Sequence, residues 1–550
     1  MLDPPPADAT RAEQLGLTTL AFLVSLPLAG WALLACGLHL NPLPLLVAVA
    51  VALACARRLT PRYLATTATV CAALVIFGLV CAWYFDLSWD GQAYHQEGIL
   101  RLAEGWNPLW DAPLDEQLRP NNLWVNHYPQ AAWIAEAVLF RATRHIEVAK
   151  LLHPAWMGTA LLLAYAALRT LDVGKRAALA LSALAALNPV ALYQWLSFYV
   201  DGLFASSLTV IAALTVLWWR RPRVGLLVAT FATLIFLCNL KFTGVIYAGM
   251  YAAGLGAAVL AWRRHAWKPV AITVAAALLS GVFLVGYSPY VINARGYGHP
   301  FHPVLGPHVQ FDVLSTSVGP SLRHHNRLVV LARTLFSRSV NTLETPRWKL
   351  PFLVDEQELI PFAATDTRIG GFGPLFGGAL LLALLALIIG TWQRARGAAQ
   401  AWLVASALVV SVLLNEGLSV ARYVPQLWLV PVIALVAARP RRLAQLAGAV
   451  LFANLFLVGG AYLGAQTLLS SRHHAQLASL RSARGDRPIE VRFKDFDTNR
   501  ERLREAGIPF LVTSGLACRP AHLLFSQTEV CLSGGRTPPS GPLPTPILAP

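Results

Sequence analysis

Apolar stretches long enough to cross a lipid bilayer recur along this chain and constrain its fold more than any other feature. About 20 consecutive apolar residues span the hydrocarbon core of a membrane as a helix. Only 13% of the 550 residues are charged, about half the share of a soluble protein. The sequence therefore predicts an all-α polytopic membrane protein. Thirteen membrane helices are predicted, at residues 16–38, 42–56, 63–85, 148–169, 177–196, 203–219, 225–241, 243–262, 270–288, 371–391, 400–417, 423–438 and 443–468.

Basic residues in the short connections predict how these helices are oriented. Alternate connections contain seventeen lysines and arginines against a single acid, Asp172. By the positive-inside rule, connections of this kind face the cytoplasm. The sequence thus predicts a multi-pass membrane protein with a cytoplasmic N-terminus and an extracytoplasmic C-terminus. The formal net charge of +16 might suggest a nucleic-acid partner. Because the basic residues cluster in short connections between apolar helices, we expect no nucleic acid as a partner.

The orientation assigns the long hydrophilic segments to the outer face. We expect a transmembrane domain at residues 1–468 that carries two outer loops, at residues 86–147 and 289–370. A small α/β outer domain is expected at residues 469–536. A disordered Pro-rich tail is expected at residues 537–550.

Local patterns predict elements inside these outer segments. Pro129–Arg144 is predicted as an amphipathic helix that lies at the membrane interface. Thr498–Ala506 is predicted as a polar helix closed by Gly507, and residues 508–513 are predicted as a strand.

Cysteine usage separates two residues from the rest. Five of the seven cysteines lie in or beside apolar stretches, where they are small packing residues. Cys518 and Cys531 share the polar C-terminal segment, and an outer compartment permits a disulfide between them. Closing so short a loop would stabilise it by about 3 kcal/mol.

An unusual polar stretch, DLSWDGQAYH, follows the apolar run 63–85. Asp86 and Asp90 are four residues apart and would share one face of a helix, with Tyr94 and His95 one turn further. A carboxylate at a membrane–water boundary can act as a general base toward a hydroxyl group. Helix capping by Asp86 and solvation of both acids explain the same pattern equally well.

Two further charged residues lie at predicted outer helix ends. Asp201 follows Ser197–Val200 in a very short turn, where helix capping is as good an interpretation as function. Lys241 interrupts a nearly continuous apolar stretch. A cation inside a membrane helix costs about 2.5–3.5 kcal/mol, so it is expected to have a partner or to reach the lipid headgroups. Its polar neighbours favour a functional position.

Later outer turns supply more cations. Arg422 and Tyr423 follow Glu416 in a short turn, and Arg295 lies in another. A local ion pair between Glu416 and Arg422 is one interpretation and contributes little stability. An arginine that binds a phosphate oxygen is the other.

Acids in the first outer loop and cations at later helix ends suit one type of reaction. In it a hydroxyl attacks, a base removes its proton, and fixed cations stabilise the charge on a leaving phosphate. The histidines show no spacing typical of a metal site, and the adjacent pair His324–His325 is not a ligand motif. No cofactor is therefore expected, while dependence on a divalent metal stays open.

Seven short motifs occur in order between about residues 80 and 430. They are Trp89–His95 (WDGQAYH), His127–Pro129 (HYP), Tyr199–Asp201 (YVD), Leu240–Gly244 (LKFTG), Tyr297–Phe301 (YGHPF), Gly370–Pro374 (GGFGP) and Ala421–Tyr423 (ARY). This ordered series resembles the motifs of the C-superfamily (GT-C fold) glycosyltransferases. The resemblance is strongest to the bacterial branch related to protein mannosyltransferases and the lipid A aminoarabinose transferase, and it implies a location in a bacterial cytoplasmic membrane. Two extra helices precede the usual first one, and no Asp-Glu pair follows it.

The resemblance implies a GT-C-like helical bundle and a donor sugar carried on polyprenyl phosphate. It implies that an aspartate of the first outer loop is the general base. Asp90 matches best through its Asp-x-x-x-Tyr-His context, and Asp86 is the second candidate. Substrate-binding residues are then expected at Tyr94, His95, His127, Asp201, Lys241, Arg295, Arg422 and Tyr423.

The function predicted from the sequence is an inverting sugar transferase that acts on the outer face of the cytoplasmic membrane. Its partners are the lipid-linked sugar donor, a hydroxyl-bearing acceptor (a glycan, lipid or protein) and membrane lipids. An oligosaccharide polymerase or ligase with a pyrophosphate-linked donor is the first alternative. A lipid-linked sugar transporter or flippase is the second, although transporters usually show internal repeats and charges near the membrane midplane.

Overall fold

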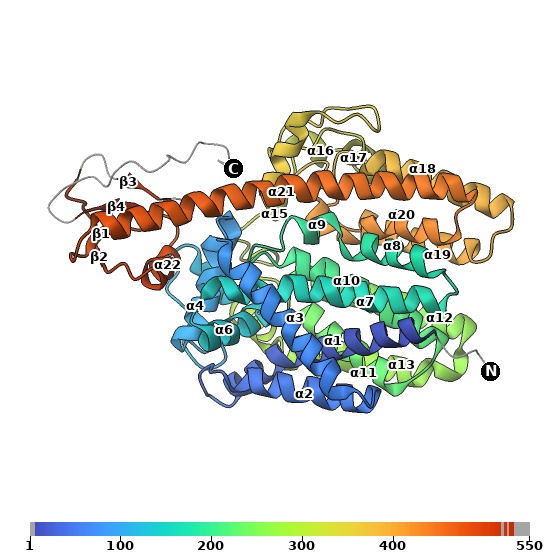
Figure 1. The fold of residues 1–550 in the computed structure, drawn as a ribbon, viewed down its shortest axis with the longest axis horizontal. Coiled ribbons are helices and arrows are strands. Elements are labelled where there is room, and N and C mark those ends of the chain that lie inside the picture. Colours follow the sequence, from blue (N-terminus) through green and yellow to red (C-terminus); the bar gives the residue numbers. More distant parts are fainter. Residues whose placement is uncertain (1–5, 519–521, 525–526, 533–550) are drawn as a thin grey trace.

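The computed structural model describes residues 6–518, 522–524 and 527–532, and these residues are mostly helical. Figure 1 shows the long helices lying roughly side by side in one bundle. The orange-red helix α21 (Arg441–Ala483) runs along the bundle and continues beyond it to a small sheet at the C-terminal end. The expected disordered tail, residues 537–550, lies outside the described residues.

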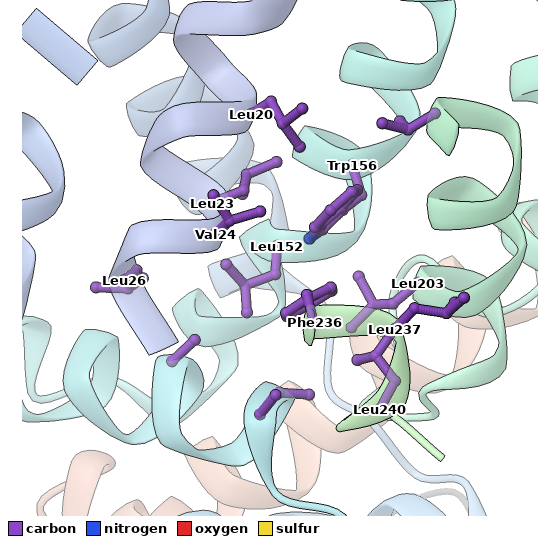
Figure 2. Packing of buried hydrophobic residues seen from close by; sticks show 14 of the residues in the cluster. Leu20, Leu23, Val24, Leu26, Leu152, Trp156, Leu203, Phe236, Leu237 and Leu240 are labelled. Atoms are coloured by element: carbon purple, nitrogen blue, oxygen red, sulfur yellow. The ribbon is translucent and has the colours of Figure 1, made fainter. Parts of the chain in front are cut away.

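The first part of the bundle is built from apolar helices around one core. Trp156 and Phe236 are stacked at its centre with their ring centroids 4.7 Å apart. Figure 2 shows Leu20 and Leu152 near this pair; Leu20 lies on the first helix of the chain, and Leu152 lies one turn before Trp156 on the same helix. The helices are α1 (Ala7–Ala35), α2 (Leu43–Leu59), α3 (Tyr63–Trp83), α6 (Ala131–Thr143), α7 (Leu152–Thr170), α10 (Asp201–Arg220), α11 (Val224–Cys238), α12 (Phe242–Trp262) and α13 (Trp267–Leu279).

The second part packs around Trp428, which is fully buried against Phe376 with ring centroids 5.3 Å apart. The indole N–H of Trp428 donates to the Leu184 carbonyl (2.6 Å), so the two chain segments are joined by a polar contact as well. Besides α21, the helices are α8 (Lys175–Ala186), α9 (Pro189–Leu192), α18 (Phe376–Trp392), α19 (Ala398–Leu413) and α20 (Leu429–Ala437).

The prediction of an apolar helical membrane protein agrees with this architecture. Among the described residues, seven helices are long and apolar enough to cross a membrane, and four shorter apolar helices accompany them. The seven spans are Ala7–Ala35, Tyr63–Trp83, Ile146–Thr170, Asp201–Arg220, Phe242–Trp262, Arg264–Leu284 and Arg441–Ala483. The shorter helices are Val224–Cys238, Phe376–Trp392, Ala398–Leu413 and Pro425–Ala437.

Several predicted helices are interrupted or change type, and two of them show how. The predicted helix 177–196 is divided into α8 and α9 at Asn188–Pro189, because proline cannot donate a backbone hydrogen bond. The Asn188 side chain instead accepts from the Val190 N–H (3.0 Å) and caps α9. The predicted helix 270–288 changes to a π-helical turn at Ser280.

The prediction of an interfacial helix at Pro129–Arg144 is wrong. The helix there, α6, has all residues from Ala131 to Leu139 buried. From Ala131 to Leu139 the one charged residue is Glu136 and the others are apolar, while Arg141 and Thr143 lie in the last turn, so the buried stretch has no polar face to turn toward water. The helix therefore lies inside the bundle and shapes the core.

Short helices fill the two long hydrophilic segments. The first segment contains η1 (Gly91–His95), α4 (Gln96–Glu104), α5 (Asn122–His127) and η2 (Ile146–Leu151). The second contains η5 (Tyr287–Val291), α14 (Ile292–Tyr297), α15 (Val313–Ser317), α16 (Pro320–Arg323), α17 (Arg327–Leu335) and η6 (Glu356–Ala363). Other short turns are η3 (Arg264–Ala266), η4 (Ser280–Leu284), η7 (Ala421–Tyr423) and η8 (Pro425–Trp428).

The C-terminal sheet has four strands in the order β2-β1-β4-β3. β1 pairs in parallel with β2, and the other pairs are antiparallel. Its elements are β1 (Ile489–Arg492), α22 (Asn499–Glu505), β2 (Phe510–Val512), β3 (His522–Leu523) and β4 (Glu529–Cys531).

The predicted polar helix and strand are present here as α22 and β2. Gly507 lies between them with φ of 66°, a left-handed conformation that glycine adopts without a steric penalty. Cys518 and Cys531, which share the polar C-terminal segment, form a disulfide.

Candidate active site

The candidate site is organised around the guanidinium group of Arg422, which contacts three carboxylates. Its Nε lies 2.9 Å from Asp366 Oδ1, and its Nη1 lies 3.3 Å from Asp90 Oδ2 and 3.5 Å from Asp201 Oδ2. Arg368 pairs with Asp366 as well (2.7 Å). Four chain segments that are far apart in the sequence therefore meet at one arginine.

A second cation completes this cluster. Lys241 forms an ion pair with the other carboxylate oxygen of Asp201. Its ammonium group also lies 4.3 Å from the ring centroid of Tyr423, a cation–π arrangement. Three carboxylates are thus balanced by Arg422, Lys241 and Arg368, so a largely buried group of charges is close to neutral.

The cluster lies where helices begin or are interrupted. Asp90 directly precedes η1, Asp201 is the first residue of α10, and Lys241 precedes the first residue of α12. Arg422 lies in η7, an irregular stretch between α19 and α20. Helix ends leave backbone groups that intrahelical hydrogen bonds do not satisfy, so charged side chains are accommodated better there than in helix interiors.

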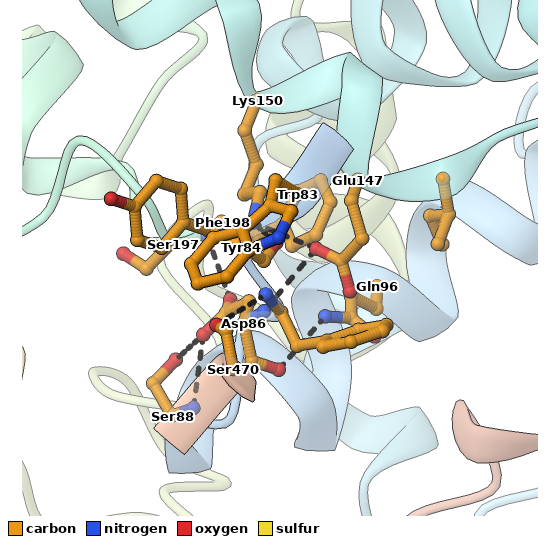
Figure 3. A network of polar contacts seen from close by, with 12 residues as sticks. Trp83, Tyr84, Asp86, Ser88, Gln96, Glu147, Lys150, Ser197, Phe198 and Ser470 are labelled. Atoms are coloured by element: carbon orange, nitrogen blue, oxygen red, sulfur yellow. Dashed lines mark hydrogen bonds and ion pairs between the residues drawn. The ribbon is translucent and has the colours of Figure 1, made fainter. Parts of the chain in front are cut away.

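The two acids predicted in the first outer loop have different surroundings. The Asp90 side chain is 22% exposed, whereas Asp86 is 1% exposed. Figure 3 shows the Asp86 carboxylate accepting from the backbone of Ser88 and Phe198. Its Oδ1 accepts from Ser88 N–H (2.9 Å) and hydroxyl (2.5 Å), and its Oδ2 accepts from Phe198 N–H (2.7 Å). Burial raises the pKa of Asp86. Asp86 therefore joins two loops, while Asp90 remains accessible.

The backbone of Asp86 is held by a buried network of charges. Its N–H donates to Glu147 (3.2 Å), and Glu147 pairs with Lys150 (2.8 Å). Arg502 of α22 also pairs with Glu147 (2.8 Å) and donates to the Asp86 carbonyl (2.5 Å). The C-terminal helix thus contacts the segment that carries Asp90.

Aromatic side chains form a wall beside Asp90. The ring centroids of Tyr94 and Tyr128 are 5.8 Å apart, and the Asp90 N–H lies 3.4 Å from the Tyr199 hydroxyl. His95 accepts a hydrogen bond from the Trp133 indole N–H (2.8 Å). Burial lowers the pKa of His95 to about 3, so the ring is neutral at physiological pH. The neutral His95 ring therefore holds the Trp133 side chain in place and adds no charge to the site.

Two residues expected at the site lie elsewhere. His127 is buried between Asn293 (2.7 Å) and Glu116 (3.1 Å), and its contacts tie α5 to α14. Arg295 is exposed and lies over the ring of Tyr287, to whose hydroxyl it donates (2.8 Å). Neither residue has a contact with the Arg422 cluster.

Sequence reasoning missed Asp366, Arg368 and Gln194. The Gln194 amide donates to Asp201 Oδ2 (3.4 Å) and to the Thr365 carbonyl (3.0 Å), so it connects two segments of the cluster. The sequence carried one indication that this segment is functional. An acid and a base, Asp366 and Arg368, stand two residues apart next to the Gly370–Pro374 motif. The interpretation of Arg422 as a partner of Glu416 is replaced by the contact with Asp366.

No group of three or more His, Cys, Asp or Glu side chains in the described part of the chain is arranged to hold a metal ion. The three carboxylates of the cluster are each directed at a cation. The arrangement can remove a proton at Asp90 and present positive charge at Arg422 and Lys241.

No family model, no curated protein and no solved structure matches this chain.

Proposed function

We propose that this protein is an inverting glycosyltransferase that moves a sugar from a polyprenyl-phosphate donor to a hydroxyl acceptor. The observation that carries the proposal is the partly exposed Asp90 carboxylate, 3.3 Å from the buried guanidinium of Arg422. The proposal includes thirteen membrane crossings, with the site and the C-terminal sheet on the outer face of a bacterial cytoplasmic membrane. The resemblance of seven ordered sequence motifs, two of which contain Asp90 and Arg422, to GT-C enzymes supports the proposal as well.

In the proposed reaction, the acceptor oxygen attacks the anomeric carbon of the donor sugar. Asp90 accepts the hydroxyl proton as the new carbon–oxygen bond forms. The bond between the anomeric carbon and the phosphate oxygen breaks, and polyprenyl phosphate leaves with the electron pair. A single displacement of this kind inverts the configuration at the anomeric carbon.

Lys241 and Arg422 supply fixed positive charge for the departing phosphate. Asp201 contacts both cations, so it holds them in place before the substrate binds. Prepositioned charge requires little reorganisation during the reaction, and this is the usual source of electrostatic catalysis. The geometry favours Asp90 over Asp86 as the base, because the Asp86 oxygens are already occupied by protein donors.

The location of the charges favours transfer over transport. The proposed orientation puts the cluster at the outer boundary of the membrane, beside the long outer loops, whereas transporter sites lie near the membrane midplane. A polymerase or ligase with a pyrophosphate-linked donor would use the same base and cations, and the donor lipid distinguishes it. Mass spectrometry of lipids that accumulate in a deletion strain identifies that donor. A monophosphate-linked sugar is expected.

The assignment of Asp90 is tested by comparing Asp90→Asn with Asp172→Asn as a control. The control side chain is 93% exposed and makes no contact with the cluster. With the donor identified above, we expect Asp90→Asn to lower the transfer rate by about 10²–10⁴-fold, the usual contribution of a general base. Full transfer activity in Asp90→Asn would show that Asp90 is not the base.

A further inference from the structure

Exposed apolar side chains gather on two short segments beside α18 and α19. They belong to the helix α17 and to the loop 347–354, and their exposed fractions reach 62% at Leu328 and 70% at Leu350. We call this set the apolar collar. It consists of Leu328, Val329, Trp348, Leu350, Phe352 and Leu353.

Both parts of the collar are fixed to the same end of the α18–α19 pair. Arg327, the first residue of α17, donates to the carbonyl of Leu413 (2.6 Å), the last residue of α19. Lys349 in the loop donates to the carbonyl of Pro374 (2.8 Å), just before α18 begins. Lys349 also pairs with Glu358 (2.7 Å), which holds the loop from its other side. The collar is therefore attached at two points, the last residue of α19 and the residues just before α18, which lie at the same end of this helix pair.

The collar continues an apolar surface that already exists on α18. Phe352 packs against Gly378 in the first turns of α18, so closely that a Cβ added there would lie 2.5 Å from the ring. Three side chains further along α18 are exposed at intervals of one turn, and they form a single apolar stripe. They are Leu381, Leu385 and Ile388. α18 is one of the shorter apolar helices of the bundle, and an exposed apolar stripe on such a helix in a membrane protein is expected to face lipid.

We infer that the apolar collar inserts into the lipid at the boundary between headgroups and acyl chains. Apolar residues that project from a helix or loop at this depth bind the membrane by burying apolar area, and nearby cations add attraction to anionic lipids. Arg347, the first residue of the loop, supplies such a cation: its side chain is 76% exposed and lies 3.8 Å from the exposed Glu344 carboxylate. The partner of this surface is thus the lipid bilayer around the protein itself.

The collar belongs to the same chain segment as part of the candidate site. Residues Val340 and Ile369 pair through backbone hydrogen bonds (3.1 Å), and the segment between them carries both the loop and Asp366. Membrane insertion of the loop would set the height of this segment above the lipid. The inference depends only on the membrane location of the bundle and not on the proposed reaction.

The test places a nitroxide label at Leu353→Cys or at Leu328→Cys in the protein reconstituted into phospholipid vesicles. Cys36, Cys55 and Cys71, the unpaired cysteines that are not buried, are first replaced by alanine. Glu344→Cys is the matched control, because it lies in the same segment with an exposed, charged side chain. Collision with oxygen, which concentrates in lipid, is compared with collision with a water-soluble nickel complex.

We expect the oxygen-to-nickel ratio to be severalfold higher at positions 353 and 328 than at position 344. Equal ratios at all three positions would place the collar in water and overturn the inference. Protection from both reagents that disappears at low protein-to-lipid ratio would assign the surface to a second copy of this chain instead. Using two labelled positions on separate segments keeps the test decisive if one variant fails to fold.

Discussion

Arg422 is the residue on which the charge balance of the candidate site depends. It is 8% exposed and contacts Asp366, Asp90 and Asp201. Removing one partner of a buried ion pair costs about 3–5 kcal/mol, because the remaining charge is left without compensation. Sites of this kind are therefore more sensitive to a single replacement than to a matched pair of replacements.

We expect Arg422→Met to lower the free energy of unfolding by about 3–5 kcal/mol. Asp366→Asn removes one of the uncompensated carboxylates, so the double variant Arg422→Met/Asp366→Asn should recover part of this loss. Thermal unfolding of the purified variants in detergent measures the difference. Losses that are simply additive would show that the two side chains do not interact in the folded protein.

At the scale of elements, α22 is one of the contacts between the C-terminal sheet and the bundle, in addition to the covalent link through α21. Arg502 is 1% exposed, and it links Glu147 to the Asp86 carbonyl. We expect Arg502→Met to destabilise this contact by about 3–5 kcal/mol and to raise amide hydrogen exchange in residues 86–95. Hydrogen-exchange mass spectrometry measures the change.

A neighbouring arginine provides the control for that prediction. Arg504 lies on the same helix with a side chain that is 55% exposed and pairs only with Glu501 in the described structure. Exposed pairs contribute about 0–1 kcal/mol, so Arg504→Met should leave exchange in residues 86–95 unchanged. If both variants loosen that segment equally, the effect belongs to α22 as a whole and not to the Arg502 contact.

The same helix carries a carboxyl group whose ionisation depends on docking. Burial raises the pKa of Glu505 to about 7, while its Oε1 accepts a hydrogen bond from the Ile146 N–H (2.8 Å). The ordinary pKa of glutamate is 4.5. Between pH 4.5 and pH 7, Glu505 therefore keeps its proton when α22 is docked and loses it when α22 is undocked. Docking is then most stable below pH 4.5 and weakens as the pH rises toward 7.

We expect the difference in docking free energy between pH 4.5 and pH 7 to be about 3 kcal/mol at most, from 1.36 kcal/mol per unit of pKa shift. Glu505→Gln cannot release a proton and should lack this part of the pH dependence. Hydrogen exchange of residues 499–505 at several pH values, in both proteins, measures it. Identical pH profiles would show that another group is responsible.

At the scale of the whole molecule, the proposed orientation makes a prediction about Cys36. This residue follows α1 and is exposed, and a cytoplasmic N-terminus places it on the outer face. A membrane-impermeant maleimide should label it in intact spheroplasts, and Cys36→Ser should abolish that labelling. A cysteine introduced as Asp172→Cys, in a connection that the proposed orientation puts in the cytoplasm, should be labelled only after lysis. The reverse pattern would require the opposite orientation.

Much of the architecture was predictable from the sequence for a local reason. Hydropathy is summed over neighbouring residues, so apolar helices such as α3 and α12 begin and end close to their predicted limits. The exceptions are local as well: Pro189 divides one predicted helix, and the mostly apolar α6 is buried instead of interfacial. Charged residues at helix ends were also recognisable, because few other positions in an apolar bundle tolerate them.

The pairing of those charges was decided only by the tertiary structure. Spacing suggested that Asp86 and Asp90 act together, yet packing buries the first against Phe198 and leaves the second beside Arg422. Asp366 meets Arg422 from a distant loop, while Arg295 contacts Tyr287 instead. Electrostatic contacts form between residues that the fold brings together, whatever their separation in the chain. The sequence by itself therefore determined the apolar helices and the charges at their ends, and the fold determined which charges meet.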